Sequence, residues 1–367
     1  MPPSPPPIAA SLLRWFGRHQ RDLPWRRTKE PYAIWISEVM LQQTRVATVI
    51  PYYERFLARF PDVTTLAAAE EDDVLEHWAG LGYYSRGRNL HRAAEFVVRE
   101  CASRFPRSAA QLRALPGVGE YTAAAVSSIA YDESVPVIDG NVERVLCRYL
   151  TLAGDPKKGN AKRQLQAAAA ALVPTRRAGD YNQALMELGA TICSPRDPDC
   201  AACPIRGGCR SAELGVTDQY PTPRSRRAAE TQHWVATVIV TRQGPQWGAA
   251  ITRSPRNAEL LAGHWGVPLQ RMHGDTAPRM ETVCEVGAQL ARDQLGPRAD
   301  LELVAVEVPT VRHAITFRRL RLHVAVLRCE QPLPDDWRVC ASTDTGALPA
   351  LHRKLIRAAL TAISEPE

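Results

Sequence analysis

The chain has 367 residues, enough for two domains with separate cores, and its 45% hydrophobic content is typical of globular proteins. A formal net charge of +7 favours a polyanionic partner. No run approaches the roughly 20 apolar residues of a membrane span, and residues 1–16 lack the pattern of a signal peptide. We therefore expect a folded cytoplasmic protein with no membrane segment.

Apolar residues recur at helical spacing through the first part of the chain. The segments with this spacing are residues 31–60, 72–82, 90–100, 119–131, 141–150 and 181–193. The pattern predicts an all-helical domain over residues 1–218.

Glu38 is the first candidate catalytic residue. Its neighbours Ile34, Trp35, Val39 and Leu41 are apolar, so its carboxylate is expected to lose much of its hydration. Burial raises a glutamate pKa from its reference of about 4.3, which suits a general acid working near neutral pH. The alternative is a partly exposed glutamate paired with an arginine.

A glycine turn follows in LPGVGEYTAAAV, residues 115–126. Gly117 and Gly119 can adopt backbone conformations closed to other residues, and the N–H groups that open the next helix would suit a phosphate. A dinucleotide-binding turn would need a preceding strand and a third glycine, where this chain has Thr122. The turn therefore predicts a helical hairpin at about 110–130 that binds phosphate.

Asp139 ends an apolar stretch and precedes apolar positions at helical spacing, so it is predicted to cap a helix N-terminus. The positive end of the helix dipole favours an ionised carboxylate there, which could stabilise a cation. One protonated and one ionised carboxyl group is the pairing that cleaves glycosidic bonds through an oxocarbenium-like state.

Four of the nine cysteines lie within seventeen residues, CSPRDPDCAACPIRGGC. Cytoplasmic cysteines stay reduced, so this cluster indicates a metal rather than disulfides. Zinc sites usually pair two short C-x2-C elements across a longer gap, whereas this compact C-x6-C-x2-C-x5-C run favours a [4Fe-4S] cluster. The predicted ligands are Cys193, Cys200, Cys203 and Cys209.

The composition changes after the cysteines. Residues 219–231 are basic and contain proline, which predicts a linker. Residues 232–364 are predicted to form an α+β domain, with strands at 233–241, 301–309 and 318–328 and helices at 280–296 and 349–363. The predicted fold class is therefore multidomain, all-α followed by α+β.

Several motifs occur together in one order: SEVMLQQTRV, GLGYYSRGRNL, LPGVGEYTAAAV, DGNVERVL, YNQALMELGATIC and the four-cysteine loop. Over roughly the first 210 residues the chain resembles the adenine DNA glycosylases of the helix-hairpin-helix superfamily. The resemblance implies a base-excision enzyme that removes adenine opposite 8-oxoguanine or guanine in duplex DNA. We expect it to work as a monomer on the nucleoid.

The resemblance also implies catalytic roles. Glu38 corresponds to the acid that protonates adenine N7, and Asp139 to the carboxylate that stabilises the sugar cation or a transient covalent adduct. Tyr121 and Asn141 would support them. Bifunctional relatives carry a lysine nucleophile at the position of Tyr121, so this chain is expected to be monofunctional.

Further positions match the family's contacts with DNA. The adenine pocket would be lined by Trp25, Arg26, Leu41 and Gln183. The less favoured alternative is that Trp25 and Leu41 are ordinary core residues. The residues expected to intercalate, with their neighbours, are Gln43, Thr44, Leu81 and Tyr83. The turn expected to hold a DNA phosphate consists of Gly117, Val118 and Gly119.

The last 130 residues, with ELLAGHWGVPL, resemble more loosely the MutT-like (Nudix-fold) domain that ends these glycosylases. A Nudix pyrophosphohydrolase would need the magnesium-binding pattern R-E-x2-E-E, but the helix offers only Glu281 and Glu285. In the family, this domain reads 8-oxoguanine through a Phe-Ser-His loop. Here Thr316 keeps a hydroxyl and Phe317 replaces the imidazole, which puts the preference for 8-oxoguanine over guanine in doubt.

Two other functions compete with adenine excision. A thymine glycosylase acting on G:T mismatches has a similar helical domain, but is not expected to carry the MutT-like module. A structural iron-sulfur protein that binds DNA without catalysis would leave Glu38 and Asp139 without a function.

Overall fold

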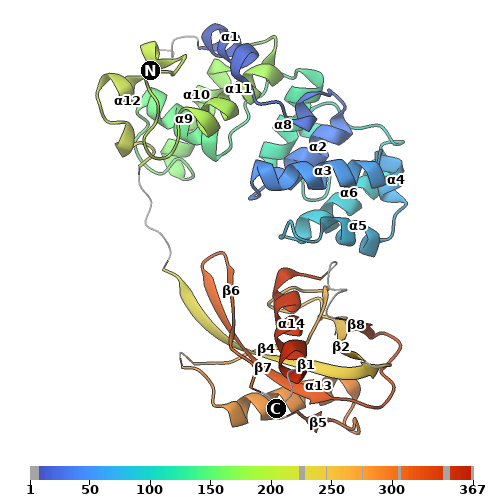
Figure 1. Ribbon diagram of the computed structural model, residues 1–367. Helices are drawn as coiled ribbons and strands as arrows, with labels where there is room; N and C mark the ends of the chain where they lie inside the picture. Colours follow the sequence, from blue (N-terminus) through green and yellow to red (C-terminus); the bar gives the residue numbers. More distant parts are fainter. Residues whose placement is uncertain are drawn as a thin grey trace. The chain divides into compact units, whose positions relative to one another are not determined.

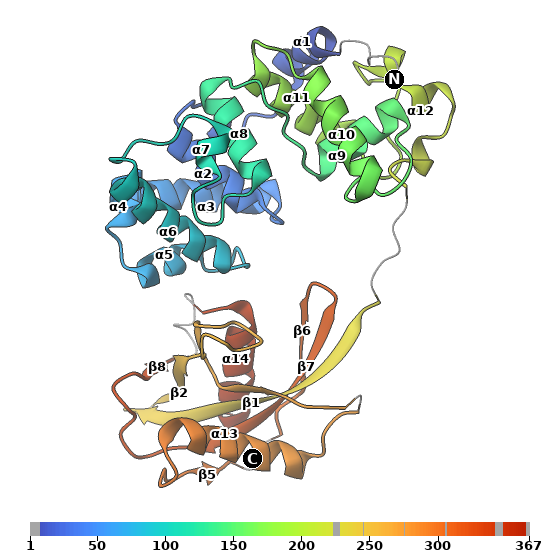
Figure 2. The same cartoon turned by 180° about the vertical axis from the view of Figure 1, so that it is seen from behind.

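The computed structural model describes residues 8–222, 228–244, 246–274, 276–304, 307–341 and 348–364. The chain divides into two compact units, Met1–Ser225 and Arg226–Glu367 (Figures 1 and 2). The first is helical and the second contains a sheet with helices, which confirms the predicted fold class. Residues 223–227 of the predicted linker lie outside the described residues. Among the described helices, none has the length and apolarity that a membrane span needs.

The helical unit consists of short and medium-length helices joined by brief turns (Figure 1). Their bounds are α1 Ala9–His19, η1 Pro24–Arg26, α2 Pro31–Leu41, α3 Val46–Arg59, α4 Val63–Ala67, α5 Glu71–Trp78, α6 Ser85–Glu100, α7 Ala109–Leu112, α8 Glu120–Tyr131, α9 Gly140–Leu150, α10 Gly159–Leu172, α11 Ala178–Thr191, η2 Arg206–Gly208, α12 Arg210–Glu213 and η3 Thr217–Gln219.

These helices enclose two apolar cores. The first contains Trp35, Phe56 and Trp78 and extends along the chain to Val137. The second joins α1 to α9, α10 and α11. Figures 1 and 2 show the corresponding two groups of helices within this unit. Asp139 therefore lies at the point where the chain passes from one core to the other.

The second unit is built on a mixed sheet of order β3-β2-β1-β7-β5, in which β1 and β7 run parallel. Alternate residues of β1 face opposite sides, as strand geometry requires. Trp234 and Ala236 share a core with α14, while Val235 packs with α13 residues on the other face. The bounds are β1 Glu230–Gln243, β2 Gln246–Arg253, β3 Trp265–Gly266, β4 Leu269–Arg271, α13 Met280–Leu295, β5 Glu302–Leu303, β6 Val311–Ile315, β7 Arg318–Arg328, β8 Arg338–Cys340 and α14 Ala350–Ser364.

The structure differs from the sequence prediction in this unit. The strand expected at 301–309 is reduced to β5, Glu302–Leu303, with residues 305–306 outside the described part of the chain. β1 begins at Glu230, inside the predicted linker, because its first residues pair with β7. The strands β2, β3, β4, β6 and β8 were not predicted. Among the described strands, β6 pairs with β7 alone.

Candidate active site

A cavity of about 430 Å³ lies within the helical unit, with walls from α2, α8, α11 and the start of α9. This volume falls in the range of small-molecule sites. The structure brings all the predicted catalytic and pocket residues to this cavity, together with Gln43 and Thr44. Those that line it are Trp25, Arg26, Glu38, Leu41, Gln43, Thr44, Tyr121, Asp139, Asn141 and Gln183.

Glu38 is buried, with 5% of its surface exposed, because nearly every position of α2 faces the core. Tyr121 Oη donates a hydrogen bond to Glu38 Oε2 at 2.6 Å. Burial raises the pKa of Glu38 to about 7, helped by Asp139 and opposed by the Tyr121 hydrogen bond and by Arg26. The predicted buried carboxyl group is confirmed, and the exposed, arginine-paired alternative is wrong.

Tyr121 acts as a hydrogen-bond donor to one of the two oxygens of Glu38. Burial and the neighbouring Glu38 raise the pKa of Tyr121 well above its ordinary value, so its hydroxyl stays protonated and acts as donor. The bond from Tyr121 occupies Oε2 of Glu38. Oε1 receives no hydrogen bond from Tyr121.

Asp139 is the N-cap of α9, as predicted. Its Oδ1 accepts from the backbone N–H groups of Asn141 at 2.9 Å and Val142 at 2.7 Å, and its Oδ2 accepts from Asn141 Nδ2 at 2.8 Å. Burial nevertheless raises the pKa of Asp139 above its ordinary value, despite these bonds and the charge of Arg144. The helix N-terminus and these hydrogen bonds favour the ionised carboxylate, and burial, which opposes them, has the larger effect on the pKa.

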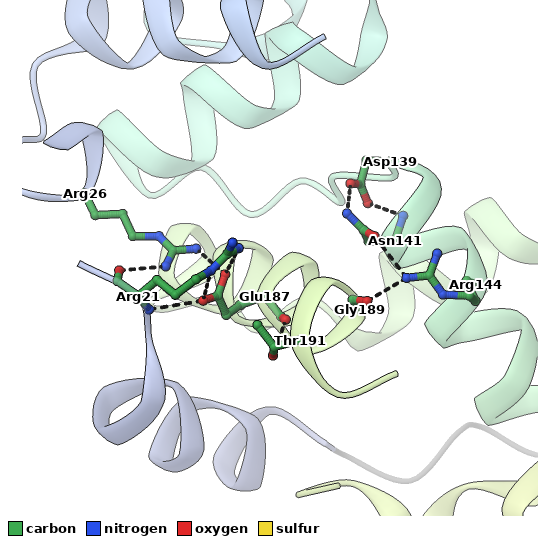
Figure 3. A network of polar contacts seen from close by, with 8 residues as sticks. All are labelled: Arg21, Arg26, Asp139, Asn141, Arg144, Glu187, Gly189 and Thr191. Atoms are coloured by element: carbon green, nitrogen blue, oxygen red, sulfur yellow. Dashed lines mark hydrogen bonds and ion pairs between the residues drawn. The ribbon is translucent and has the colours of Figure 1, made fainter. Parts of the chain in front are cut away.

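Arg144 connects Asn141 to the rest of the unit (Figure 3). Its Nη2 donates to Asn141 Oδ1 at 3.0 Å and to the Gly189 carbonyl at 2.6 Å, and its Nε donates to the Cys193 carbonyl at 2.7 Å. Asn141 is thereby held in the orientation that lets its amide donate to Asp139. The sequence analysis missed Arg144, whose partners Gly189 and Cys193 lie far along the chain.

The predicted base pocket combines apolar and polar walls. Trp25 lines the cavity and also packs edge-on against Tyr53, with ring centroids 5.5 Å apart, so it is both core and pocket wall. Gln183 Nε2 donates to the Gly179 carbonyl at 3.4 Å. Arg26 Nη2 is bound to Glu187 at 2.8 Å. The site therefore offers a flat apolar surface together with hydrogen-bonding groups.

Two predicted intercalating residues lie on turns with left-handed backbone. Gln43 has φ of 59° and Tyr83 has φ of 46°, which is uncommon for residues other than glycine. Tyr83 is 44% exposed, which suits contact with a base stack. The side chain of Leu81 is buried in the first core, and its backbone N–H donates to the Trp78 carbonyl at 3.1 Å. Its contact with DNA stays a prediction.

Arg86 joins these two turns and was missed by the sequence analysis. Its Nη1 donates to the Gln42 carbonyl at 2.5 Å, and its Nη2 donates to Thr44 Oγ1 and to the Leu81 carbonyl, both at 3.2 Å. Burial lowers the pKa of Arg86 to about 10, so it remains charged at neutral pH. One side chain thus holds both left-handed turns in place.

The glycine turn between α7 and α8 is confirmed in part. Gly117 has φ of 73°, and a Cβ there would lie 2.5 Å from Asn89 Cβ, so the position requires glycine. Gly119 has an ordinary φ of −86°, which corrects the expectation for this residue. The Val118 N–H donates to the Leu115 carbonyl at 3.1 Å, so it is already used within the turn.

The four clustered cysteines line a second, apolar cavity beside α9 and α11. All four are free thiols, and Arg148 Nη1 donates to Cys193 Sγ at 3.3 Å. Within the described ranges, no three His, Cys, Asp or Glu side chains converge in the way needed to hold a metal ion. The loop therefore presents four cysteine sulfurs, which are soft metal ligands, around one apolar cavity.

In the second unit, Thr316 and Phe317 form the two-residue turn between β6 and β7. Thr316 is exposed, has φ of 54°, and its hydroxyl donates to the Ile315 carbonyl at 2.7 Å. The hydroxyl oxygen therefore keeps its capacity to accept a hydrogen bond.

Comparison with known proteins identifies the fold of the helical unit. The family described as HhH-GPD superfamily base excision DNA repair protein matches residues 36–170. The solved structure of a thermostable thymine-DNA glycosylase is 30% identical, with a TM-score of 0.52, and the match covers 56% of this chain and 95% of that one. The helical unit therefore has the fold of a base-excision glycosylase.

Curated relatives are similar over more of the chain. The human adenine DNA glycosylase is 49% identical over 218 residues, 57% of this chain and 40% of the relative, and the mouse protein is 48% identical over 308 residues, 71% and 59%. The chain thus spans less than two thirds of these relatives. The adenine DNA glycosylase of Buchnera aphidicola subsp. Schizaphis graminum is 35% identical over 238 residues, 64% of this chain and 68% of the relative. The chain belongs to the adenine DNA glycosylase family.

Proposed function

We propose that the protein excises adenine mispaired with 8-oxoguanine or guanine in duplex DNA, by hydrolysis of the N-glycosidic bond. The observation that supports this most strongly is the cavity in which Glu38, with a pKa of about 7, faces the same space as hydrogen-bonded Asp139. A group with this pKa is partly protonated at neutral pH and can act as an acid. An extruded adenine would lie between these two groups.

The proposed reaction divides the work between the two carboxyl groups. Glu38 donates its proton to N7 of adenine, which makes the base a better leaving group. The bond between C1′ and N9 then breaks, the electron pair leaves with adenine, and Asp139 stabilises the positive sugar or forms a transient adduct with it. Water adds to C1′ and loses a proton, so the product is an intact strand with an abasic site.

Thymine excision from G:T mismatches is the second candidate, because the solved thymine-DNA glycosylase shares the fold of the helical unit at 30% identity. Duplexes carrying A opposite 8-oxoguanine, A opposite G and T opposite G distinguish the two. We expect single-turnover excision from the first two and none from the third. Faster excision of thymine than of adenine would favour the second candidate instead.

We further propose that the Thr316 hydroxyl oxygen accepts a hydrogen bond from the oxidised guanine, and that Gln43 and Tyr83 fill the space left by the extruded base. The exposure of Tyr83 and the two-residue turn that presents Thr316 support these roles. Phe317 offers no imidazole donor, so the preference for 8-oxoguanine over guanine is expected to be smaller than in relatives with the Phe-Ser-His loop.

Cys193, Cys200, Cys203 and Cys209 are proposed to hold a [4Fe-4S] cluster. Each thiolate of such a cluster binds a different iron atom, so the sulfurs need not converge on one point, and four free thiols around one apolar cavity fit this donor set. The cluster would shape the loop that carries Arg196, Arg206 and Arg210, which are exposed and can bind DNA phosphates.

Protein purified without oxygen is expected to contain iron and sulfide in equal amounts and to absorb broadly near about 400 nm. Cys200→Ser should reduce the iron content and weaken binding to duplex DNA, because the loop loses one of its four anchors. Cys101→Ser, which changes a half-buried cysteine outside the loop, is the matched control. It should leave the iron content and the binding to duplex DNA unchanged. Bound zinc without sulfide would contradict the cluster.

Tyr121→Lys tests whether an amine nucleophile at position 121 is enough to cause strand cleavage. The wild type should leave the strand intact until alkali or heat is applied. In the variant, the new amine would lie near Glu38, which favours its charged form and holds Glu38 ionised. We therefore expect slow, borohydride-trappable strand cleavage together with slower adenine release.

Tyr121→Phe is the control for Tyr121→Lys, since it removes the hydroxyl without adding an amine. It should give no trapped complex. Strong alkali-independent cleavage by the wild type would show that Tyr121 does not mark a monofunctional enzyme.

A further inference from the structure

Glu187 is a buried carboxylate that lines the cavity and has no part in the proposed reaction. It lies on α11 one turn beyond Gln183, and only 1% of its side chain is exposed. Burial alone would raise its pKa, but hydrogen bonds from Arg21 and Arg26 outweigh it and lower the pKa of Glu187 to about 2. Glu187 is therefore ionised at any pH at which the protein works.

Two arginines converge on this carboxylate (Figure 3). Arg21 binds both oxygens, with Nε at 2.8 Å from Oε1 and Nη2 at 2.7 Å from Oε2, and its backbone N–H donates to Oε1 at 3.1 Å. Arg26 Nη2 donates to Oε2 at 2.8 Å. The forked contact with Arg21 fixes the direction of the carboxylate, so the contact with Arg26 is also directional.

Arg26 is held on several sides. Its Nη1 donates to the Arg21 carbonyl at 3.0 Å, and its guanidinium carbon lies 5.2 Å from the centre of the Phe16 ring. Two of its five N–H donors are therefore used by bonds within the described part of the chain, and Arg26 itself lines the cavity. The remaining donors are available to a ligand in the cavity.

We propose that Glu187 is a positioning residue for the extruded adenine. It holds the Arg26 guanidinium at the cavity wall to donate to the purine edge, and it balances the charge of Arg26, which acts on Glu38. This inference rests on the proposed excision of adenine. Without Glu187 the two guanidinium groups would repel each other, and Arg26 would lose the partner that orients it.

The balance of charge extends to Glu38. The groups that act on Glu38 are Tyr121 from α8, Asp139 before α9 and Arg26 from η1, in addition to burial. Removing the negative charge of Glu187 leaves the positive charge of Arg26 less compensated. The ionised form of Glu38 is then favoured, so its pKa should fall.

Glu187→Gln keeps the size of the side chain and removes its charge. We expect the single-turnover excision rate on an A:8-oxoguanine duplex at neutral pH to fall by about ten- to a hundredfold, because the base is less well placed. In a plot of rate against pH, the fall in rate with rising pH should shift to lower pH by about one unit. A purely structural role would reduce the amount of folded protein without producing this shift. Glu95→Gln, on the exposed face of α6, is the matched control and should change neither.

A double-mutant cycle tests whether Glu187 acts through Arg26. Glu187→Gln should cost much less in an Arg26→Met background than in the wild type, since the residue that it positions is absent. Glu187→Asp keeps the charge and should keep the pH profile near that of the wild type, which also provides a test if the glutamine variant does not fold.

Equal losses in the two backgrounds, or an unchanged rate and pH profile for Glu187→Gln, would overturn the positioning role. These outcomes are separable from failure of the proposed function, because that failure would appear as a wild-type protein that releases no adenine.

Discussion

Glu38→Gln is expected to lower the single-turnover rate of adenine excision by about 10²–10⁴-fold, the usual cost of losing a general acid. Glutamine keeps the size of the side chain and can still accept the 2.6 Å hydrogen bond from Tyr121, but it has no proton to transfer. Binding to the duplex should stay near the wild-type value, because Glu38 is buried away from the surface. Rates at saturating enzyme and dissociation constants, measured on the same duplex, separate the two effects.

The pH dependence gives a second measure of Glu38. Its pKa is raised to about 7, so the wild-type rate should fall as the pH increases through about 7 and the group loses its proton. In Glu38→Gln this limb should disappear. Glu95→Gln is the control, and it should retain both the rate and the limb. Full excision by Glu38→Gln would end the proposal that Glu38 is the acid.

Asp139→Asn is expected to reduce excision by a similar factor of about 10²–10⁴ while leaving the fold nearly as stable. Asparagine caps helices about as well as aspartate, so the free energy of unfolding should change by only a few tenths of a kcal/mol. The neutral side chain cannot stabilise a sugar cation, and its amide nitrogen would face the Nδ2 donor of Asn141 in place of Oδ2. Excision rates and chemical denaturation measure the two consequences.

Asp62→Asn provides the matched control for the cap. Asp62 is the N-cap of α4 and accepts from the Thr65 N–H at 2.7 Å, but it is absent from the cavity lining. The same substitution there should change stability slightly and excision not at all. If Asp139→Asn excises adenine at the wild-type rate, Asp139 is only a cap.

Local sequence patterns were enough to predict the site residues whose burial or capping depends on their neighbours in the sequence. The apolar neighbours of Glu38 predicted its burial, and the apolar spacing after Asp139 predicted its cap. The upward shift of the Asp139 pKa could not be predicted from its neighbours in the sequence. It depends on burial between two cores that are assembled from helices far apart in the chain.

The residues that were missed act over long separations. Glu187 pairs with Arg21, 166 positions earlier in the chain, and Arg86 binds carbonyls at the end of α2, more than 40 positions earlier. A buried ion pair of this kind leaves no periodic signal in either segment. The strand predicted at 301–309 is a different case, because an apolar alternation was present, but among the described residues of this segment the strand that pairs with β7 is limited to Glu302–Leu303.

The proposed enzyme releases adenine as the free base and leaves the DNA strand intact. The most direct measurement is chemical identification of the base freed from an A:8-oxoguanine duplex by the full chain under single-turnover conditions, with abasic sites counted on the same sample. We expect free adenine and abasic sites in equal amounts, with strand cleavage only after alkali. No released base, or thymine released from a G:T duplex in preference to adenine, would contradict it.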